Sequence, residues 1–300
     1  MVKSIDPQSL PVRELHGYLL GAVAPRPIAF ASTVDKAGNV NLSPFSFFNV
    51  FSANPPVMIF SPARRATNNT TKHTYENLLE VPEVVINIVN HPIVEQMSLT
   101  STDYPDGVNE FAKAGLTEVP SVRVKPPRVA ESPVSFECVV DDVVQLGDQG
   151  GAGNLIICRV VMLHLDDAYL DADGKLDTTR LDLVGRMGGS WYCRANGAAL
   201  FEIPKPLRTR GIGVDELPAS VQQSAVLTGN NLGRLGNLEH LPTADELQAA
   251  RDMPAVAEIL ELQAKDPQSG LEQLHQLAQR YLEQGETKQA LATLMAGEME

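Results

Sequence analysis

The first two thirds of the sequence predict a mainly β protein, either an antiparallel barrel or a sandwich. Short apolar, β-prone runs follow one another up to about Cys193, separated by turns rich in glycine and proline and interrupted by few helical patterns. The 300 residues, 43% of them hydrophobic, suffice for one large core or two modest ones. The helical pattern that begins near Thr243 predicts an additional helical extension.

The predicted strands are short and turn back on one another. Residues 28–34 are apolar and β-prone, and the DKAGN that follows supplies the glycine and asparagine of a hairpin turn at Gly38. Residues 132–146 carry apolar side chains on alternate positions and face residues 154–165 across the loop GDQGGAG. Because this loop joins two strands and opens no helix, we interpret it as a hairpin loop and not as a phosphate-binding loop. The other expected strands are residues 57–60 and 83–89.

Two short helices are predicted within the β region, and both would pack on the barrel. One covers residues 74–80, with Thr74 as its N-cap. The other covers residues 92–101 and starts with a proline, which is favoured in the first turn.

The predicted organisation has three parts, namely a barrel at residues 1–200, a connector at 201–243 and a helical appendage at 244–300. The connector begins with a stretch rich in proline and glycine. Within the appendage, an apolar stripe at helical spacing consists of Leu271, Leu274, Leu277, Ala278, Tyr281 and Leu282. Gly285 would separate the two helices of a hairpin.

Composition excludes several classes of function. A formal net charge of −13 argues against binding to nucleic acid, because that binding requires a basic surface. We find neither an apolar run long enough for a membrane helix nor the pattern of a secretory signal, and we therefore expect a cytoplasmic protein without membrane contact. The cysteines Cys138, Cys158 and Cys193 form no CxxC pair, so we expect them to be buried without a disulfide or a metal site.

Motif searches also narrow the choice. The sequence GIGVDE lacks the third glycine of a dinucleotide fingerprint, and YLDADGKLDTTR lacks the terminal carboxylates of a calcium loop. No serine lies in a nucleophile-elbow context and no HExxH occurs, so hydrolase functions receive little support.

One segment has the composition of a phosphate site. Between Ser61 and Thr74, the basic residues Arg64, Arg65 and Lys72 alternate with short hydroxyl and amide donors. Fixed cations and short donors together form the charge-assisted hydrogen bonds that a phosphate dianion prefers. The donors are Thr67, Asn68, Asn69, Thr70 and Thr71. A solvated polar loop is the alternative interpretation of this segment.

The segment upstream, NLSPFSFFN at residues 41–49, combines proline with phenylalanine. A proline removes an N–H donor from a central strand, so this backbone is expected to leave the sheet and to offer donors and aromatic faces to a flat ring. A phosphate site beside such a platform suggests a phosphorylated ring cofactor. A purely aromatic core remains the alternative.

These segments resemble the flavin reductase-like, FMN-binding split-barrel family, which includes flavoredoxin and the reductase components of two-component monooxygenases. The resemblance extends from about Leu10 to Asn196 and is carried by ordered blocks. One departure is His73, where many members have aspartate. The blocks are PRPIAFASTVDKAGNVNLSPFSFFNVFSANPPVMIFSP, KHT, EVVINIV, STDYPDGVNEFAKAGLTEVPS, ESPVSFEC and LDLVGRMGGSWYCRAN.

The resemblance implies a six-stranded Greek-key split β-barrel with peripheral helices, and a homodimer that binds FMN noncovalently at the edge of the subunit contact. It also implies a set of cofactor-binding residues. The isoalloxazine ring would lie on the backbone of Ser43, Pro44, Phe45, Ser46, Phe47, Phe48 and Asn49. The phosphate would be held by Ser61, Arg64, Lys72 and Thr74. Arg26 and Thr33 would flank the ring or the phosphate, and Trp191 and Tyr192 would either cover the flavin or belong to the core.

The function implied is an NAD(P)H-dependent flavin reductase that passes electrons through FMN to free flavin, to a partner oxygenase or to another acceptor. No catalytic side chain is assigned, because the cofactor carries the chemistry. The alternative is a flavin-binding electron carrier of the flavoredoxin type without NAD(P)H oxidation. A third hypothesis assigns the helical appendage the role of an interaction module.

Overall fold

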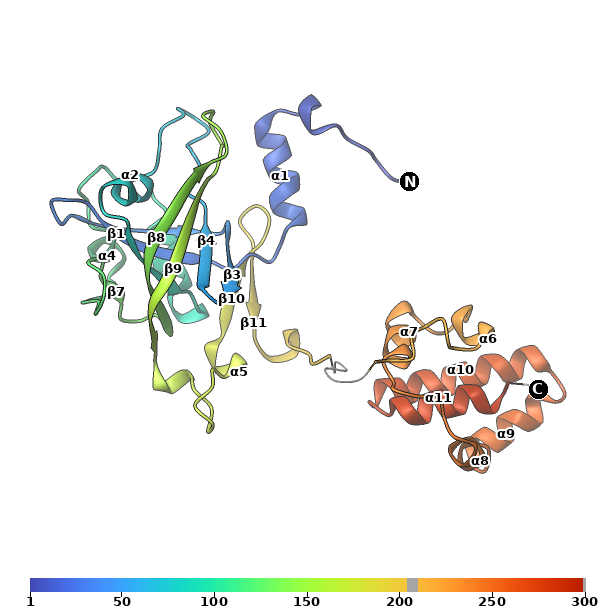
Figure 1. Cartoon of the computed structure of the whole chain (residues 1–300). Coiled ribbons are helices and arrows are strands. Elements are labelled where there is room, and N and C mark those ends of the chain that lie inside the picture. The colour runs from blue at the N-terminus through green and yellow to red at the C-terminus, as the bar shows by residue number, and fades with distance from the viewer. Residues whose placement is uncertain (204–209, 299–300) are drawn as a thin grey trace. The chain divides into compact units, whose positions relative to one another are not determined.

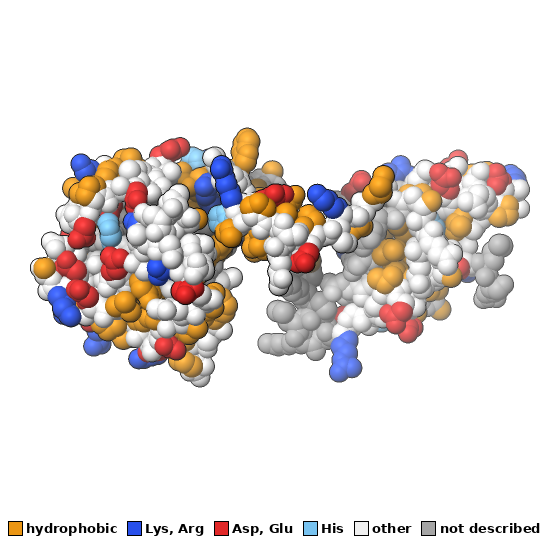
Figure 2. All heavy atoms as spheres, turned by 90° about the horizontal axis from the view of Figure 1, so that it is seen from above, with side chains coloured by type: hydrophobic (Ala, Val, Ile, Leu, Met, Phe, Trp, Pro, Cys, Tyr) orange, Lys and Arg blue, Asp and Glu red, His pale blue; other side chains and the backbone are white. Residues whose placement is uncertain are grey.

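The computed structural model describes residues 1–203 and 210–298. The chain forms two compact units, Met1–Phe201 and Glu202–Glu300, and each is described by itself (Figure 1). Within the described ranges, none of the helices combines the length and the apolar character that crossing a bilayer requires. On the face drawn in Figure 2, acidic side chains are mixed with basic and hydrophobic ones.

The first unit is built on one antiparallel sheet of seven strands, ordered β2-β1-β5-β8-β9-β4-β3. The expectation of a six-stranded barrel is therefore wrong, because the sheet has one strand more. The strands are β1 (Ala29–Val34), β2 (Val40–Phe45), β3 (Phe48–Ala53), β4 (Pro56–Phe60), β5 (Glu83–Ile88), β8 (Val134–Gln145) and β9 (Asn154–Leu165). The two edge strands, β2 and β3, do not pair with each other in the described sheet, yet only Ser46 and Phe47 connect them. Because two residues span a short distance, the sheet must curl until its two edge strands lie near each other without pairing, which produces an open barrel.

The additional strand comes from the segment that was expected to leave the sheet. Residues 40–45 and 48–53 remain in it as the two edge strands, and only the link between them leaves it. Pro44 is tolerated because an edge strand can leave an N–H unpaired. The predicted hairpin turn is confirmed, since Gly38 has a φ of +89°, a conformation that favours glycine.

The interior of the barrel is apolar and closed at one end by α2 (His73–Glu80). Side chains of six strands and of α2 meet there. The buried cluster consists of Ala29, Ala31, Phe45, Met58, Phe60, Tyr75, Leu78, Val84, Ile86, Cys138, Ile156 and Cys158. The expected burial is confirmed for Cys138 and Cys158 and wrong for Cys193, which is half-buried. Burial raises the pKa of the Cys138 thiol to about 12.

A second apolar cluster covers the outer face of β1 and β2, where α3 (Val94–Leu99) and α4 (Glu110–Ala114) pack. The predicted helix at residues 92–101 is confirmed; it starts as a 3-10 turn at His91–Ile93 and continues as α3. The smaller elements of this unit are α1 (Val12–Ala22), β6 (Glu118–Val119), β7 (Arg128–Val129), α5 (Thr178–Leu181), β10 (Leu183–Arg186) and β11 (Tyr192–Ala195).

The second unit is helical and has its own core. Its helices are α6 (Ala219–Gln222), α7 (Gly229–Gly236), α8 (Ala244–Arg251), α9 (Pro254–Gln263), α10 (Pro267–Glu283) and α11 (Thr287–Ala296). The predicted stripe of α10 is buried at Leu274, Leu277 and Leu282, and Gly285 turns the chain into α11 with a φ of +84°. Part of the expected connector packs on these helices, because Val221 and Leu235 join their apolar cluster.

Candidate functional site

Three segments of the first unit meet beside the link between β2 and β3. The amide of Ser61 donates to the carbonyl of Phe47 at 2.9 Å, which joins the link to the loop that follows β4. That loop in turn bonds to the β8–β9 hairpin, where the amide of Arg64 donates to the carbonyl of Ala152 at 2.8 Å. The link, the loop at 61–72 and the hairpin loop at 147–153 therefore form one structural assembly.

The glycines of the hairpin loop allow this contact. A Cβ on Gly150 would lie 3.1 Å from the carbonyl oxygen of Ala66 and 3.2 Å from that of Arg65, which is tighter than side chains normally approach backbone. The side chain of Asn69 also donates to the carbonyl of Asp148 at 2.9 Å. The loop is a hairpin loop, as predicted, and it additionally braces the loop after β4.

The phenylalanines of the predicted platform have different environments. Phe45 is buried and packs on Phe60 with ring centroids 5.5 Å apart, and Phe48 packs against the same core. Phe47, in the link, is 42% exposed and lies edge-on to His16 of α1. Of these three rings, Phe47 is therefore the one available to a ligand.

The other residues predicted to line the ring flank that link. Ser43 and Pro44 lie in β2 opposite Ala31 and Phe30, and both are half-buried. Asn49 is exposed in β3, and its side-chain oxygen accepts from the amide of Val50 at 2.8 Å.

The side chain of Arg26 is buried and holds three segments together. Its guanidinium donates to the carbonyls of Leu20 and Val23 at 2.6 and 2.5 Å, to the carbonyl of Met187 at 3.0 Å and to the hydroxyl of Ser46 at 3.4 Å. Burial, and then the charge of Arg186, lower the pKa of Arg26. These contacts hold Arg26 next to the link through Ser46, and its N–H donors are used by oxygens of the protein.

Thr33 in β1 and Thr74 in α2 are buried, and each is hydrogen-bonded to an asparagine side chain. The Thr33 hydroxyl accepts from the side chain of Asn77 at 3.2 Å, and the Thr74 hydroxyl accepts from that of Asn41 at 2.8 Å. The expected N-cap role of Thr74 is wrong, because the helix begins at His73 with Lys72 in the N-cap position. The contact with Asn41 in β2 draws the Thr74 side chain toward the barrel.

Two polar groups near this assembly lack partners among the residues that the structure describes. The hydroxyl of Ser61 is buried and forms no hydrogen bond with any of them. The ammonium of Lys72 forms no hydrogen bond or ion pair within the described part of the chain, and its pKa is lowered by burial and then by the charge of Arg65, against an opposing effect of Asp103. Buried polar groups normally find partners, so these two are available for an anion.

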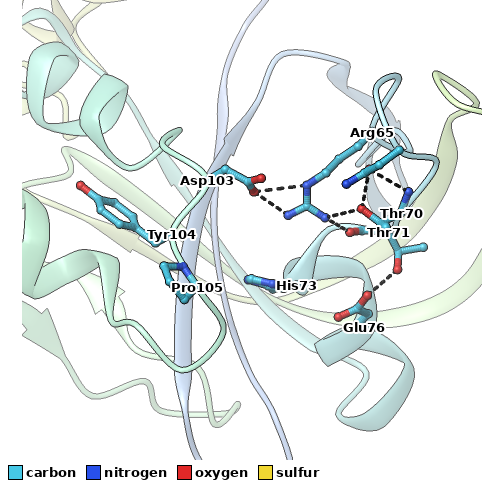
Figure 3. A pocket seen from close by; sticks show the side chains of 9 residues that line it. Arg65, Thr70, Thr71, His73, Glu76, Asp103, Tyr104 and Pro105 are labelled. Atoms are coloured by element: carbon cyan, nitrogen blue, oxygen red, sulfur yellow. Dashed lines mark hydrogen bonds and ion pairs between the residues drawn. The ribbon is translucent and has the colours of Figure 1, made fainter.

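The two neighbouring arginines of the loop have different roles. Arg64 is occupied within the loop, since its guanidinium donates to the side-chain oxygen of Asn69 at 2.7 Å and to its carbonyl at 2.6 Å. Arg65 lines a pocket of about 430 Å³, which Figure 3 shows from close by. It also donates to the Thr70 hydroxyl at 3.1 Å and to the carbonyl of Thr71.

The pocket has two walls from segments far apart in the sequence. One wall belongs to the loop after β4 and to the start of α2, including His73 and Glu76, and the other is Asp103, Tyr104 and Pro105 (Figure 3). Our reading of the sequence missed the second wall, because nothing local marks the contact of Asp103 with a residue 38 positions away. The first wall lies within the polar segment 61–74, and its role as a phosphate site stays a prediction.

The turn between β10 and β11 borders the same region through Arg26. Trp191 lies in this turn and is 78% exposed, whereas Tyr192 lies under the guanidinium of Arg186 with 4.6 Å from that carbon to the ring centroid. Trp191 is therefore free to cover a ligand, and Tyr192 is held by its own neighbour. Among the described residues, the region combines a hydroxyl and an ammonium without partners with exposed aromatic rings, and this combination fits a phosphorylated ring compound.

Known proteins resemble this unit in sequence and structure. Residues 21–180 match the family described as flavin reductase like domain. An uncharacterized protein from Halalkalibacterium halodurans is 42% identical over 190 residues, which cover 63% of this chain and 90% of that protein. Nitrilotriacetate monooxygenase component B from Bacillus cereus is 30% identical with a TM-score of 0.63, over 68% of this chain and 99% of that one. A candidate flavin reductase with a split barrel domain from Shewanella frigidimarina NCIMB 400 is 28% identical with a TM-score of 0.55, over 66% of this chain and 95% of that one.

These findings confirm the resemblance that the motifs indicated. The family match alone spans more than half of the 300 residues, and it includes the link, the loop after β4 and the β8–β9 hairpin. This chain therefore belongs to the flavin reductase-like family.

Proposed function

We propose that the protein is an FMN-binding oxidoreductase that accepts hydride from NADH or NADPH and passes electrons to free flavin or to a partner protein. Family membership supports a flavin, and the groups without partners in the site support a phosphorylated one. FMN would supply the hydride-accepting ring, and the chain would supply binding, orientation and electrostatic tuning.

The residues divide between the ring and the phosphate. The backbone of the link, together with the exposed ring of Phe47, would face the isoalloxazine, with Ser46 held in place by Arg26. Lys72 and Ser61 would contact the phosphate. Arg64 and Thr74 would act by shaping the loop and the start of α2, because their side chains are already hydrogen-bonded within the protein.

The observation that carries this proposal is the buried hydroxyl of Ser61, which has no hydrogen-bond partner in the described part of the chain. Leaving a buried hydroxyl unpaired costs about 1–3 kcal/mol, and a bound phosphate oxygen would remove that cost. The hydroxyl belongs to the residue whose amide bonds to Phe47, so one ligand can meet both the hydroxyl and the aromatic link.

A homodimer is part of the proposal. None of the eleven residues of α1 is buried, although Val12, Tyr18 and Leu19 are large and apolar. A helix that leaves large apolar side chains exposed is typical of an interface. Sedimentation velocity would measure the mass in solution, and a monomer at micromolar concentration would contradict the proposal.

The test of function uses purified protein saturated with FMN without oxygen. NADH or NADPH is then added, and the blue absorption band of the flavin is followed. Rapid bleaching would support the reductase. A persistent band despite tight FMN binding would support the electron carrier, and absence of FMN binding would reject both.

For the reductase, the acceptor is a separate question. The similar protein from Bacillus cereus is described as a monooxygenase component, which makes an oxygenase our first proposal for the electron acceptor. Free flavin is the second, and it is tested by adding excess FMN or FAD and measuring steady oxidation of NADH.

A further inference from the structure

The pocket in Figure 3 contains an ion pair between its two walls. A terminal nitrogen of Arg65 lies 2.6 Å from a carboxylate oxygen of Asp103, and the Arg65 Nε donates to the same oxygen at 3.2 Å. The two side chains differ in exposure, with 15% for Arg65 and 66% for Asp103. The arginine is therefore fixed in the pocket wall, whereas the carboxylate reaches it from the solvent side.

Asp103 sits where basic groups converge. Its pKa is lowered first by the hydrogen bond from Arg65; burial opposes this, and the charges of Arg65, Lys72 and His73 lower the pKa further. Lys72 has no ion pair of its own in the described residues, and Arg65 has no other carboxylate partner there. Glu76, the other acid that lines the pocket, accepts from the hydroxyl of Thr71.

We propose that Asp103 occupies the position of a ligand phosphate, and that it is an intramolecular competitor for anions at this site. A phosphate group on a bound nucleotide would take the guanidinium of Arg65 and displace the Asp103 carboxylate toward solvent. Asp103 thereby sets how strongly the protein favours phosphorylated over unphosphorylated ligands. The inference rests on the proposed function for the identity of the nucleotide, FMN, but the anion site is argued from the pocket itself.

The exchange is chemically reasonable in both directions. The carboxylate of the pair is mostly exposed to water, which screens the attraction, so losing the contact with Asp103 costs little. A phosphate monoester carries more negative charge than one carboxylate and offers three acceptor oxygens to the planar fork of an arginine. Without ligand, Asp103 keeps the arginine paired.

The test compares Asp103→Asn with a matched control, Asp106→Asn. Asp106 is exposed in the same loop and carries the same charge, and within residues 1–203 and 210–298 it forms no ion pair with a basic side chain. Dissociation constants for FMN, for riboflavin and for inorganic phosphate are measured by fluorescence titration and calorimetry. Riboflavin has the same ring without the phosphate.

We expect Asp103→Asn to bind FMN and inorganic phosphate about three- to tenfold more tightly than wild type, with riboflavin affinity unchanged within about twofold. Asp106→Asn should shift none of the three affinities beyond about twofold, since it changes net charge without touching Arg65. Weaker FMN binding by Asp103→Asn would overturn the inference, because Asp103 would then be a ligand contact. An equal gain for riboflavin, or an equal gain in Asp106→Asn, would overturn it as well.

Failure of the proposed function gives a different pattern. If wild type binds neither flavin, the cofactor assignment is wrong, and the phosphate measurement alone decides about Asp103. Tighter inorganic phosphate binding by Asp103→Asn would then still support the competitor, and identical phosphate affinities would reject it.

Discussion

At the scale of single residues, the site is defined by polar groups that the protein itself leaves unpaired. Ser61 and Lys72 stand apart from Thr33, Thr74 and Arg64, whose side chains all have protein partners. Residue type alone cannot separate these two groups, since both contain hydroxyls and cations. The difference lies in contacts from β2, α2 and the loop itself.

Replacing Lys72 tests the phosphate contact. Lys72→Ala should weaken FMN binding by about 1.5–3 kcal/mol, because a hydrogen bond between two charged groups is lost, and should leave riboflavin affinity unchanged. Lys36→Ala, on the β1–β2 turn, is the matched control. Fluorescence titration measures both ligands, and unchanged FMN affinity in Lys72→Ala would remove Lys72 from the site.

Replacing Ser61 should change stability and binding in opposite directions. Ser61→Ala removes a buried hydroxyl without a partner, so the free energy of unfolding without ligand should rise by about 1 kcal/mol or more. The same variant should bind FMN more weakly. Ser32→Ala is the control, because the Ser32 hydroxyl donates to the carbonyl of Pro127 and its loss should destabilise. Urea unfolding gives both free energies, and a less stable Ser61→Ala would show that the hydroxyl is satisfied.

At the scale of elements, one buried arginine ties α1, the β2–β3 link and the turn after β10 together. Arg26→Met should lower the free energy of unfolding by at least about 2 kcal/mol, since it leaves several carbonyls without donors. It should also speed hydrogen exchange in α1 more than in β5. Arg128→Met is the control, because Arg128 makes only 3.4 Å contacts with the carbonyl of Pro120. Equal exchange in α1 of both variants would contradict a role for Arg26 in docking that helix.

The elements that could be predicted are those whose signal is local. The β8–β9 hairpin, the turn at Gly38 and the apolar stripe of α10 each follow from periodicity or turn residues within a short window. The strand at residues 48–53 was missed, because its pairing with β4 and the edge position of β2 depend on curling of the whole sheet. The bracing of the loop after β4 by Gly150 depends on the same long-range packing.

The candidate site also has one part with a local sequence signal and another part that depends on long-range packing. Its basic first wall was visible as composition in residues 61–74, whereas the contact of Arg65 with Asp103 arises only in the folded chain. Membership of the family was visible from ordered motifs. The sequence could not show that the Ser61 hydroxyl lacks a hydrogen-bond partner among the described residues, because this depends on which groups surround it in the folded chain.

At the scale of the whole molecule, the chain combines a unit that belongs to a known family with a helical unit beyond the family match. The match ends at residue 180, and the compact barrel unit ends at Phe201. The apolar clusters respect this division, since two lie in the barrel unit and two in the helical unit. Each unit therefore has the buried core that independent folding requires.

Truncation tests this division and assigns the flavin site. We expect residues 1–203 alone to unfold in one cooperative transition and to bind FMN within about twofold of the full chain, because every side chain argued for the site comes from that unit. Thermal unfolding followed by circular dichroism, FMN titration and sedimentation measure folding, binding and mass. A folded fragment that keeps the flavin and the oligomeric state would leave the helical unit free to bind another protein. Loss of either property would make the helices a structural part of the flavoprotein, since a unit with its own core affects the barrel only through direct contact.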